Sequence, residues 1–390
     1  MRLPIFGLLL IAAFAPRASA QETKVLFLGN SYTNVNNLPA LFANLAQAAG
    51  HAVTTDKNTP GGNTLGAPQS SGSPHRSNQV SLAKIAANDW DVVVLQEQSY
   101  LPTIPYTRDQ FMRPGAQSLA NSIAANDPAI RVMLFSTWGR RDGGSFCYGP
   151  YCQSFADFDA MQDALSAAYG DVAASIGAEV AMVGEAWRRA RTLDPTLVLH
   201  SADGSHPSLA GSYLAACVFY ARIFDESPVG LAFDAGLDPT QAAFLQEVAN
   251  SIGRCGSERY CLAAPNSVNS AGASIDSSGS ASVAANDMVL MASQAPPGQL
   301  GIFLVARVRG LMRVGDGLLC LGGVFYRLSG VQIDAAGGAA LPIDLTQFPF
   351  GAGAVAPGIT QNFQFVYRDP NGPHGSGWNL SDALTIMFCP

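Results

Sequence analysis

Phe27-Leu28-Gly29-Asn30-Ser31-Tyr32-Thr33 is the stretch that decides the fold of this 390-residue chain. Val25–Leu28 is a short apolar run, typical of a strand that is covered on both faces. Gly29 permits a tight turn directly after that strand. The turn places Ser31 just beyond the carboxyl end of the strand, at the edge where open α/β sheets build their sites.

Residues 21–255 repeat this alternation of strand and helix. Further strand-like runs follow at Val92–Leu95, Val132–Phe135 and Glu179–Val183. Helical patterns cover Leu38–Ala49, Gln79–Ala87, Arg108–Ala125, Phe155–Ile176, Ser208–Phe224 and Thr240–Ile252. Strand, helix and strand in turn predict parallel crossovers and an open α/β/α sheet.

From about Cys255 the pattern changes to short β-type runs separated by turns. We expect a linker at 256–275 and a β-sandwich-like domain at 276–390. The runs that predict its strands are Asp287–Ala292, Gly301–Val308, Gly317–Leu321, Val324–Leu328, Gln361–Tyr367 and Ala383–Phe388.

Composition excludes several classes of protein. With 48% hydrophobic and 13% charged residues, the chain is neither disordered, nor a coiled coil, nor collagen-like. Its net charge of -7 argues against non-specific binding to nucleic acid, which needs clustered positive charge.

The first 20 residues predict a secretory signal peptide. Arg2 precedes the apolar stretch Leu3–Phe14, and Ala18-Ser19-Ala20 is a small-residue cleavage site. The mature chain would start near Gln21, and an uncleaved membrane anchor is the alternative. No later stretch reaches about 18 apolar residues, so no integral membrane segment is expected after cleavage. We therefore expect an exported protein in the periplasm, at the cell surface or outside the cell.

Seven cysteines in an exported chain predict disulfides with one thiol left over. Cys217 lies in an apolar helical run and is expected to be the buried free thiol. The spacing suggests three pairs without fixing the connectivity: Cys147 with Cys152, Cys255 with Cys261, and Cys320 with Cys389. No cysteine or histidine cluster has the spacing of a zinc site, so no metal is expected.

Asp203-Gly204-Ser205-His206-Pro207 is the second stretch with possible chemistry. A serine nucleophile needs a base, and the base needs a carboxylate to fix its tautomer. Asp203, three residues before His206 in a glycine-containing turn, can place its carboxylate against the imidazole. The alternative is that Asp203 only stabilises the turn and His206 is exposed.

Together these stretches resemble the SGNH (GDSL-like) hydrolases, serine esterases with a flavodoxin-like sheet. Pro60-Gly61-Gly62-Asn63-Thr64 resembles the second block of that family, and Val92–Ser99 occupies the place of the third. The resemblance implies that Ser31, His206 and Asp203 form a catalytic triad. It also implies an oxyanion hole from the backbone N–H groups of Ser31 and Gly62. The family's third-block asparagine is missing here, and Gln98 or Gln96 would replace its amide.

The resemblance implies a carboxylesterase or acetylesterase that needs no cofactor. The predicted secretion and the appended β module suggest a small-molecule or polysaccharide ester as its substrate. The alternative is a catalytically degenerate binding or surface protein on the same scaffold. A lipase or thioesterase ranks lower, because no large lid-like apolar insertion is evident. The chain's end also resembles a β module that is appended to secreted bacterial proteins, which suggests attachment, sorting or carbohydrate contact.

Overall fold

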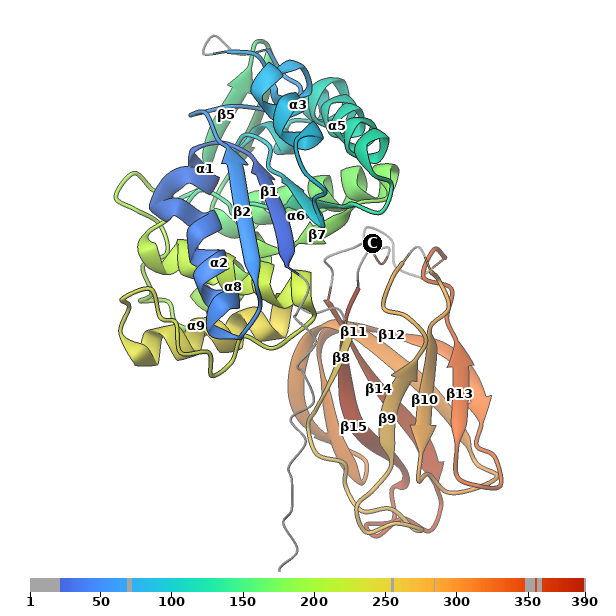
Figure 1. Cartoon of the computed structure of the whole chain (residues 1–390). Helices are drawn as coiled ribbons and strands as arrows, with labels where there is room; N and C mark the ends of the chain where they lie inside the picture. Colours follow the sequence, from blue (N-terminus) through green and yellow to red (C-terminus); the bar gives the residue numbers. More distant parts are fainter. Residues whose placement is uncertain are drawn as a thin grey trace, which may run out of the picture.

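The computed structural model describes residues 22–68, 72–253, 256–283, 285–347, 355 and 360–388. The predicted signal peptide, Gln21, Cys255 and Cys389 lie outside these residues. Figure 1 shows an α/β region, coloured blue to yellow, and a β region, coloured orange to red. Among the helices that the structure describes, none is both long and apolar enough to cross a membrane.

A five-stranded parallel sheet forms the centre of the α/β region (Figure 1). Its strand order is β2-β1-β3-β4-β7, and every neighbouring pair is parallel. This is the flavodoxin-like order, so the predicted α/β/α fold is confirmed. The strands are β1 (Thr23–Leu28), β2 (Val53–Asn58), β3 (Val92–Leu95), β4 (Arg131–Phe135) and β7 (Glu179–Ala181).

Helices cover both faces of this sheet, with α2 and α8 on one face and α3, α5 and α6 on the other. The helices are α1 (Ser31–Asn34), α2 (Leu38–Ala48), α3 (Gln79–Ala86), α4 (Pro105–Thr107), α5 (Arg113–Asn126), α6 (Phe158–Ile176), α7 (Val183–Leu193), α8 (Leu209–Phe224) and α9 (Pro239–Gly253). Helix α8 is buried on nearly every side, as its apolar sequence predicts. Cys217, on this helix, is buried and free as expected.

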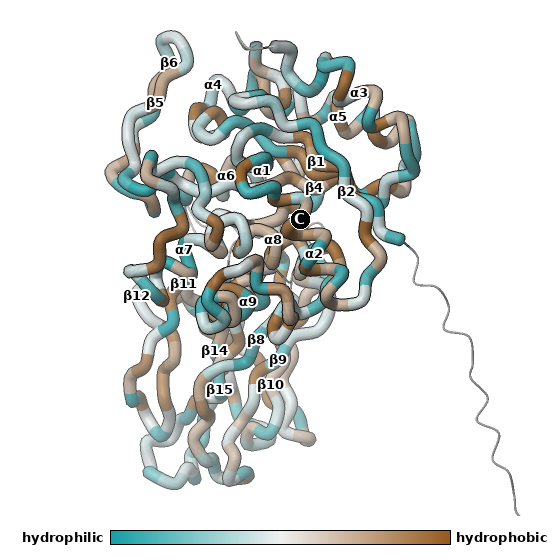
Figure 2. Tube along the Cα trace, turned by 60° about the vertical axis from the view of Figure 1, so that its left-hand side comes forward, coloured by the Kyte–Doolittle hydropathy of each residue, from teal (hydrophilic) through white to brown (hydrophobic). Residues whose placement is uncertain are grey.

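Three elements of the α/β region differ from expectation. Strand β2 has a polar sequence and lies at the edge of the sheet, whereas β1 is apolar from Val25 to Leu28 (Figure 2). Strand β7 ends at Ala181, and α7 begins at Val183, where the sequence suggested a continuing strand. The hairpin of β5 (Gly144–Tyr148) and β6 (Tyr151–Phe155) is also new, and the Cys147–Cys152 disulfide joins its strands.

The β region consists of two antiparallel sheets that share a core. Ile275 and Leu290 of one sheet pack in the same cluster as Phe303 and Phe365 of the other, which fits the predicted sandwich. The strands form the orders β13-β10-β9 and β12-β11-β14-β15-β8. Their bounds are β8 (Gly256–Tyr260), β9 (Ser274–Ser278), β10 (Val289–Ser293), β11 (Leu300–Val314), β12 (Gly317–Gln332), β13 (Ala339–Pro342), β14 (Thr360–Asp369) and β15 (Gly377–Met387).

Two segments of the β region carry more strand than the sequence suggested. Strand β8 falls within the range 256–275 that was expected as a linker, and it pairs with β15. The two runs expected at Gly317–Leu321 and Val324–Leu328 form the single strand β12. Gly323 lies between them with a φ of 64°, which lets the chain bend without ending the strand.

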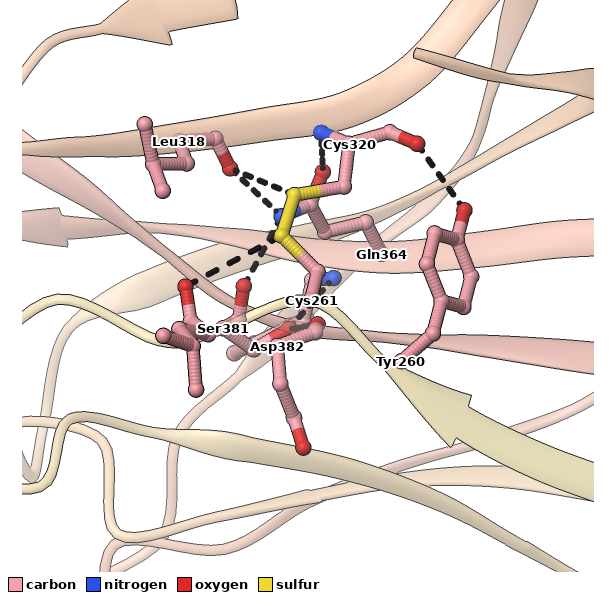
Figure 3. The surroundings of a disulfide bond; sticks show 9 residues. Tyr260, Cys261, Leu318, Cys320, Gln364, Ser381 and Asp382 are labelled. Atoms are coloured by element: carbon pink, nitrogen blue, oxygen red, sulfur yellow. Dashed lines mark hydrogen bonds between the residues drawn. A yellow bond between two sulfur atoms is a disulfide. The ribbon is translucent and has the colours of Figure 1, made fainter. Parts of the chain in front are cut away.

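A disulfide joins Cys261, which follows β8, to Cys320 in β12 (Figure 3). The suggested pairing of Cys261 with Cys255, and of Cys320 with Cys389, is therefore wrong. Because β8 and β12 stand at opposite ends of the strand order, the disulfide ties the two edges of the sheet together. Gln364 of β14 helps to hold β12 near this disulfide. It accepts from the Cys320 N–H at 2.9 Å and donates to the Leu318 carbonyl at 2.7 Å.

Candidate active site

Ser31 is the first residue of α1 and follows β1 at the carboxyl edge of the sheet. Asn30 caps the helix, because its side-chain oxygen accepts from the Tyr32 N–H at 3.1 Å. Position 29 has no room for a side chain, because a Cβ there would lie 2.6 Å from Gln96 Oε1 and from Thr33 Oγ1. The turn after β1 is thus held tightly enough to fix the direction of Ser31.

Ser31, His206 and Asp203 lie in a hydrogen-bonded row, although 175 residues separate the serine from the histidine. Ser31 Oγ is 2.9 Å from His206 Nε2, and His206 Nδ1 is 2.6 Å from Asp203 Oδ2. The other oxygen of Asp203 accepts from the N–H groups of Ser205 and His206, each at 2.9 Å. The turn that carries His206 is therefore organised around the Asp203 carboxylate.

The charge of Asp203 determines how the row is protonated. Burial acts to raise the pKa of the Asp203 carboxyl, but the hydrogen bonds from His206 and from the two backbone N–H groups outweigh it. The pKa is consequently held well below its usual range, and the group is a carboxylate that only accepts. His206 Nδ1 must then carry a proton, and this is the imidazole tautomer whose Nε2 can accept from the Ser31 hydroxyl.

The two candidate glutamines occupy different positions after β3. Gln96 is fully buried, and its Oε1 accepts from the Asn30 N–H at 2.9 Å and the Thr33 hydroxyl at 3.0 Å. Its Nε2 donates to the Glu97 carbonyl. Gln98 is half-buried, and its Nε2 donates to Ser99 Oγ at 3.2 Å. Gln96 thus supports the turn that carries Ser31, whereas Gln98 holds its amide in a partly exposed position.

The Gly62 loop is joined to the β3 loop by a buried carboxyl group. Glu97 accepts from the Gln98 N–H at 2.7 Å and from the Leu65 N–H at 3.2 Å. Burial raises the pKa of Glu97 to about 8, although these two hydrogen bonds act to lower it. Gly62 itself is exposed, with a φ of 68° that favours glycine. The loop is also tied to the turn after β1, because Asn30 Nδ2 donates to the Asn63 carbonyl at 2.9 Å.

His75 is a fully buried histidine that the motifs do not predict. Its Nε2 donates to the Gly29 carbonyl at 2.8 Å, and its Nδ1 contacts Ser81 Oγ at 2.7 Å. Burial lowers the pKa of His75 to about 4, so the ring is neutral near pH 7. It therefore braces the turn that carries Ser31, and both ring nitrogens are engaged in doing so. Nothing in its polar sequence context signals this burial.

Aromatic side chains pack behind Ser31, His206 and Asp203. Tyr32 stacks on Trp138 with ring centroids 4.6 Å apart, and its edge meets the His206 ring at 5.5 Å. The Tyr32 hydroxyl is 2.8 Å from Ser205 Oγ, and Trp138 Nε1 donates to the Ser205 carbonyl at 2.9 Å. The β1, β4 and His206 loops are thus packed as one unit. Among the described residues, no cluster of three or more histidine, cysteine or acidic side chains could hold a metal ion.

Comparison with known proteins gives similarities to solved structures alone. No family model matches the chain, and no curated protein matches it. A DUF4886 family protein from Bacteroides uniformis is 19% identical, with a TM-score of 0.49, over 59% of this chain and 94% of that one. A candidate SGNH hydrolase from Slackia heliotrinireducens is 28% identical, with a TM-score of 0.39, over 51% and 98%. An aryl esterase of M. smegmatis is 14% identical, with a TM-score of 0.35, over 52% and 99%.

Proposed function

We propose that this chain is an exported serine ester hydrolase of the carboxylesterase or acetylesterase type. The observation that carries the proposal is the row Ser31–His206–Asp203, with contacts of 2.9 and 2.6 Å between groups from the two ends of the α/β region. A serine hydroxyl, a neutral imidazole and a buttressing carboxylate in this order are the groups that nucleophilic acyl transfer needs.

In the proposed reaction His206 Nε2 takes the proton of Ser31 while Ser31 Oγ attacks the carbonyl carbon of the ester. The tetrahedral intermediate collapses, the alcohol leaves with the proton from His206, and an acyl-serine remains. Water then attacks the acyl group, with His206 again as the base, and Ser31 is regenerated with release of the acid. Asp203 stabilises the imidazolium in both steps.

The proposed oxyanion hole consists of the backbone N–H groups of Ser31 and Gly62 and the side-chain amide of Gln98. We favour Gln98 over Gln96 because Gln98 is half-buried, whereas Gln96 is fully buried and its amide holds the turn that carries Ser31. Loss of one such donor costs about 10²- to 10³-fold in rate. Glu97 would hold the hole together, since it binds N–H groups of both contributing loops.

The proposed substrates are small esters or acylated polysaccharides met outside the cytoplasm. Support for export comes from the predicted signal peptide, and the two disulfides are compatible with it. We include acylated polysaccharides among the substrates because the appended β region is a candidate attachment module. A catalytically degenerate binding protein is the competing proposal, and an activated serine separates the two.

The test is hydrolysis of p-nitrophenyl esters from acetate to octanoate, together with covalent labelling by an organophosphonate. We expect turnover and stoichiometric labelling of the wild type, and neither in Ser31→Ala. Ser122→Ala, on α5 and remote from the site, is the matched serine control and should behave like the wild type. Unchanged hydrolysis by Ser31→Ala would overturn the proposal, and a folded wild type that is neither active nor labelled would favour the binding protein.

A further inference from the structure

Arg140, in the loop after β4, is a half-buried cation with no counter-ion among the described residues. Its Nη2 donates to Ser99 Oγ at 2.9 Å, and its guanidinium lies 5.7 Å from the centre of the Phe146 ring. Its Nε is buried without a hydrogen-bond partner in the described part of the chain. The adjacent Arg141 differs, since it is exposed and pairs with Asp142 at 2.9 Å. A guanidinium that is partly removed from water is costly unless an acceptor reaches it.

Backbone and ring contacts hold the Arg140 loop against the loop that carries His206. The Arg141 N–H donates to the Gly204 carbonyl at 2.9 Å. His200 Nε2 lies 2.9 Å from the Gly139 carbonyl, and Trp138 Nε1 donates to the Ser205 carbonyl. The Arg140 loop is therefore a fixed support next to the loop that carries His206.

The Arg140 side chain reaches from this support to the loop after β3. Ser99, its hydrogen-bond partner, is buried in the loop after β3, next to Gln98. Burial raises the pKa of Tyr32, and the nearby Arg140 guanidinium is the strongest influence in the opposite direction. Because Tyr32 directly follows Ser31 in the chain, the cation lies at the same edge of the sheet as the proposed nucleophile.

We propose that Arg140 binds a carboxylate of the substrate, so that the preferred esters carry a negative charge near the scissile bond. This inference rests on the proposed function. Arginine binds carboxylates through paired, charge-assisted hydrogen bonds. The Arg140 guanidinium has five N–H donors, of which Nη2 gives one to Ser99 Oγ. A chain with a net charge of -7 would otherwise repel an anionic ester. A cation at the same edge of the sheet as the nucleophile opposes that repulsion locally.

The test compares anionic esters with neutral esters of the same size. p-Nitrophenyl hemiglutarate against p-nitrophenyl pentanoate places the charge on the acyl side, and 4-acetoxybenzoate against 4-acetoxybenzamide places it on the alcohol side. We expect the wild type to favour the anionic member of one pair in kcat/KM. Arg140→Gln should lower that preference by about tenfold to a hundredfold, the loss expected for a charge-assisted hydrogen bond.

Two further variants separate recognition from a structural or general charge effect. Arg141→Gln, which removes a neighbouring cation already paired with Asp142, should keep the preference of the wild type. Arg140→Lys keeps the charge and should retain part of the preference. Equal ratios of anionic to neutral turnover in the wild type and Arg140→Gln would overturn the inference while leaving the esterase intact.

A binding measurement decides the question even without turnover. Calorimetry with monomethyl glutarate should detect binding to Ser31→Ala, and weaker binding, again by about tenfold or more, to the double variant Ser31→Ala with Arg140→Gln. Equal affinities would refute the role of Arg140. If the wild type hydrolyses no ester, the proposed function fails, and this comparison still tests the carboxylate site on its own.

Discussion

At the scale of single residues, Asp203 is the group whose removal should be the most informative. Asp203→Asn would keep the side chain's size but could also donate to His206 Nδ1, which favours the wrong imidazole tautomer. We expect kcat to fall by about 10⁴-fold with little change in KM. Asp142→Asn removes an exposed carboxylate on a neighbouring loop and is the matched control. Near-normal turnover by Asp203→Asn would exclude Asp203 from the triad.

Glu97 should make the stability of the α/β region depend on pH. Its pKa is about 8 when folded and near 4.5 when exposed, so the unfolded chain releases this proton first as the pH rises. The contribution of Glu97 to the free energy of unfolding is therefore greatest below pH 4.5 and is lost as the pH rises to about 8. Its slope is at most about 1.4 kcal/mol per pH unit.

Glu97→Gln removes this titration, so the variant should lose less stability than the wild type between about pH 6.5 and 8. Denaturant unfolding at several pH values measures the difference. Buried His75 and His200, with pKa values lowered to about 4 from 6.5, act in the opposite direction below pH 6.5, so the comparison avoids that range. Glu247→Gln, on the exposed side of α9, is the control. If the free energy of unfolding changed with pH to the same extent in the wild type and in Glu97→Gln, the prediction would be wrong.

At the scale of elements, the turn between β1 and α1 depends on the absence of a side chain at Gly29. In Gly29→Ala the new methyl group would lie 2.6 Å from Gln96 Oε1 and Thr33 Oγ1, so the turn must move. We expect a loss of about 1–3 kcal/mol in the free energy of unfolding, together with a lower kcat because Ser31 is displaced. In Gly61→Ala the methyl group meets no atom within 4 Å, so its stability is the control. Equal stability of Gly29→Ala and Gly61→Ala would contradict the predicted clash at position 29.

The elements that the sequence predicts are those with an apolar pattern. Strand β3 was expected at Val92–Leu95 and has those bounds, because each of its residues is buried. Strand β2 escaped prediction because an edge strand with one buried residue has no apolar run. The β5–β6 hairpin is largely exposed, and its disulfide was a better signal than its hydropathy.

The site was predictable to the same limited extent. Ser31, Asp203 and His206 belong to short motifs with characteristic neighbours, so their types and order indicate a function. Glu97 and Arg140 act through positions that only the packed fold creates. Glu97 is deeply buried, and Arg140 is half-buried against the loop after β3. No local pattern encodes either property. The same reason explains the wrong pairing of Cys261, whose partner depends on how the fold brings β8 and β12 together.

At the scale of the whole molecule, the two regions have separate hydrophobic cores. The α/β core includes one residue from the β region as far as the structure describes it, Met387 of β15. The sandwich core, over the same described residues, is built within the β region. Cores that share so little buried surface should unfold as separate units. Scanning calorimetry of the full mature chain should therefore resolve two transitions.

Removing the Cys261–Cys320 disulfide should then lower one transition and leave the other in place. The cross-link spans 59 residues, and the chain-entropy model gives about 4 kcal/mol for a loop of that size. In the double variant Cys261→Ala with Cys320→Ala, we expect the β-region transition to move to lower temperature. Thermal loss of ester hydrolysis should follow the other transition and stay unchanged, because Ser31 and His206 lie in the α/β region. A single transition that moves with the activity would mean that contacts such as Met387 couple the two regions into one folding unit.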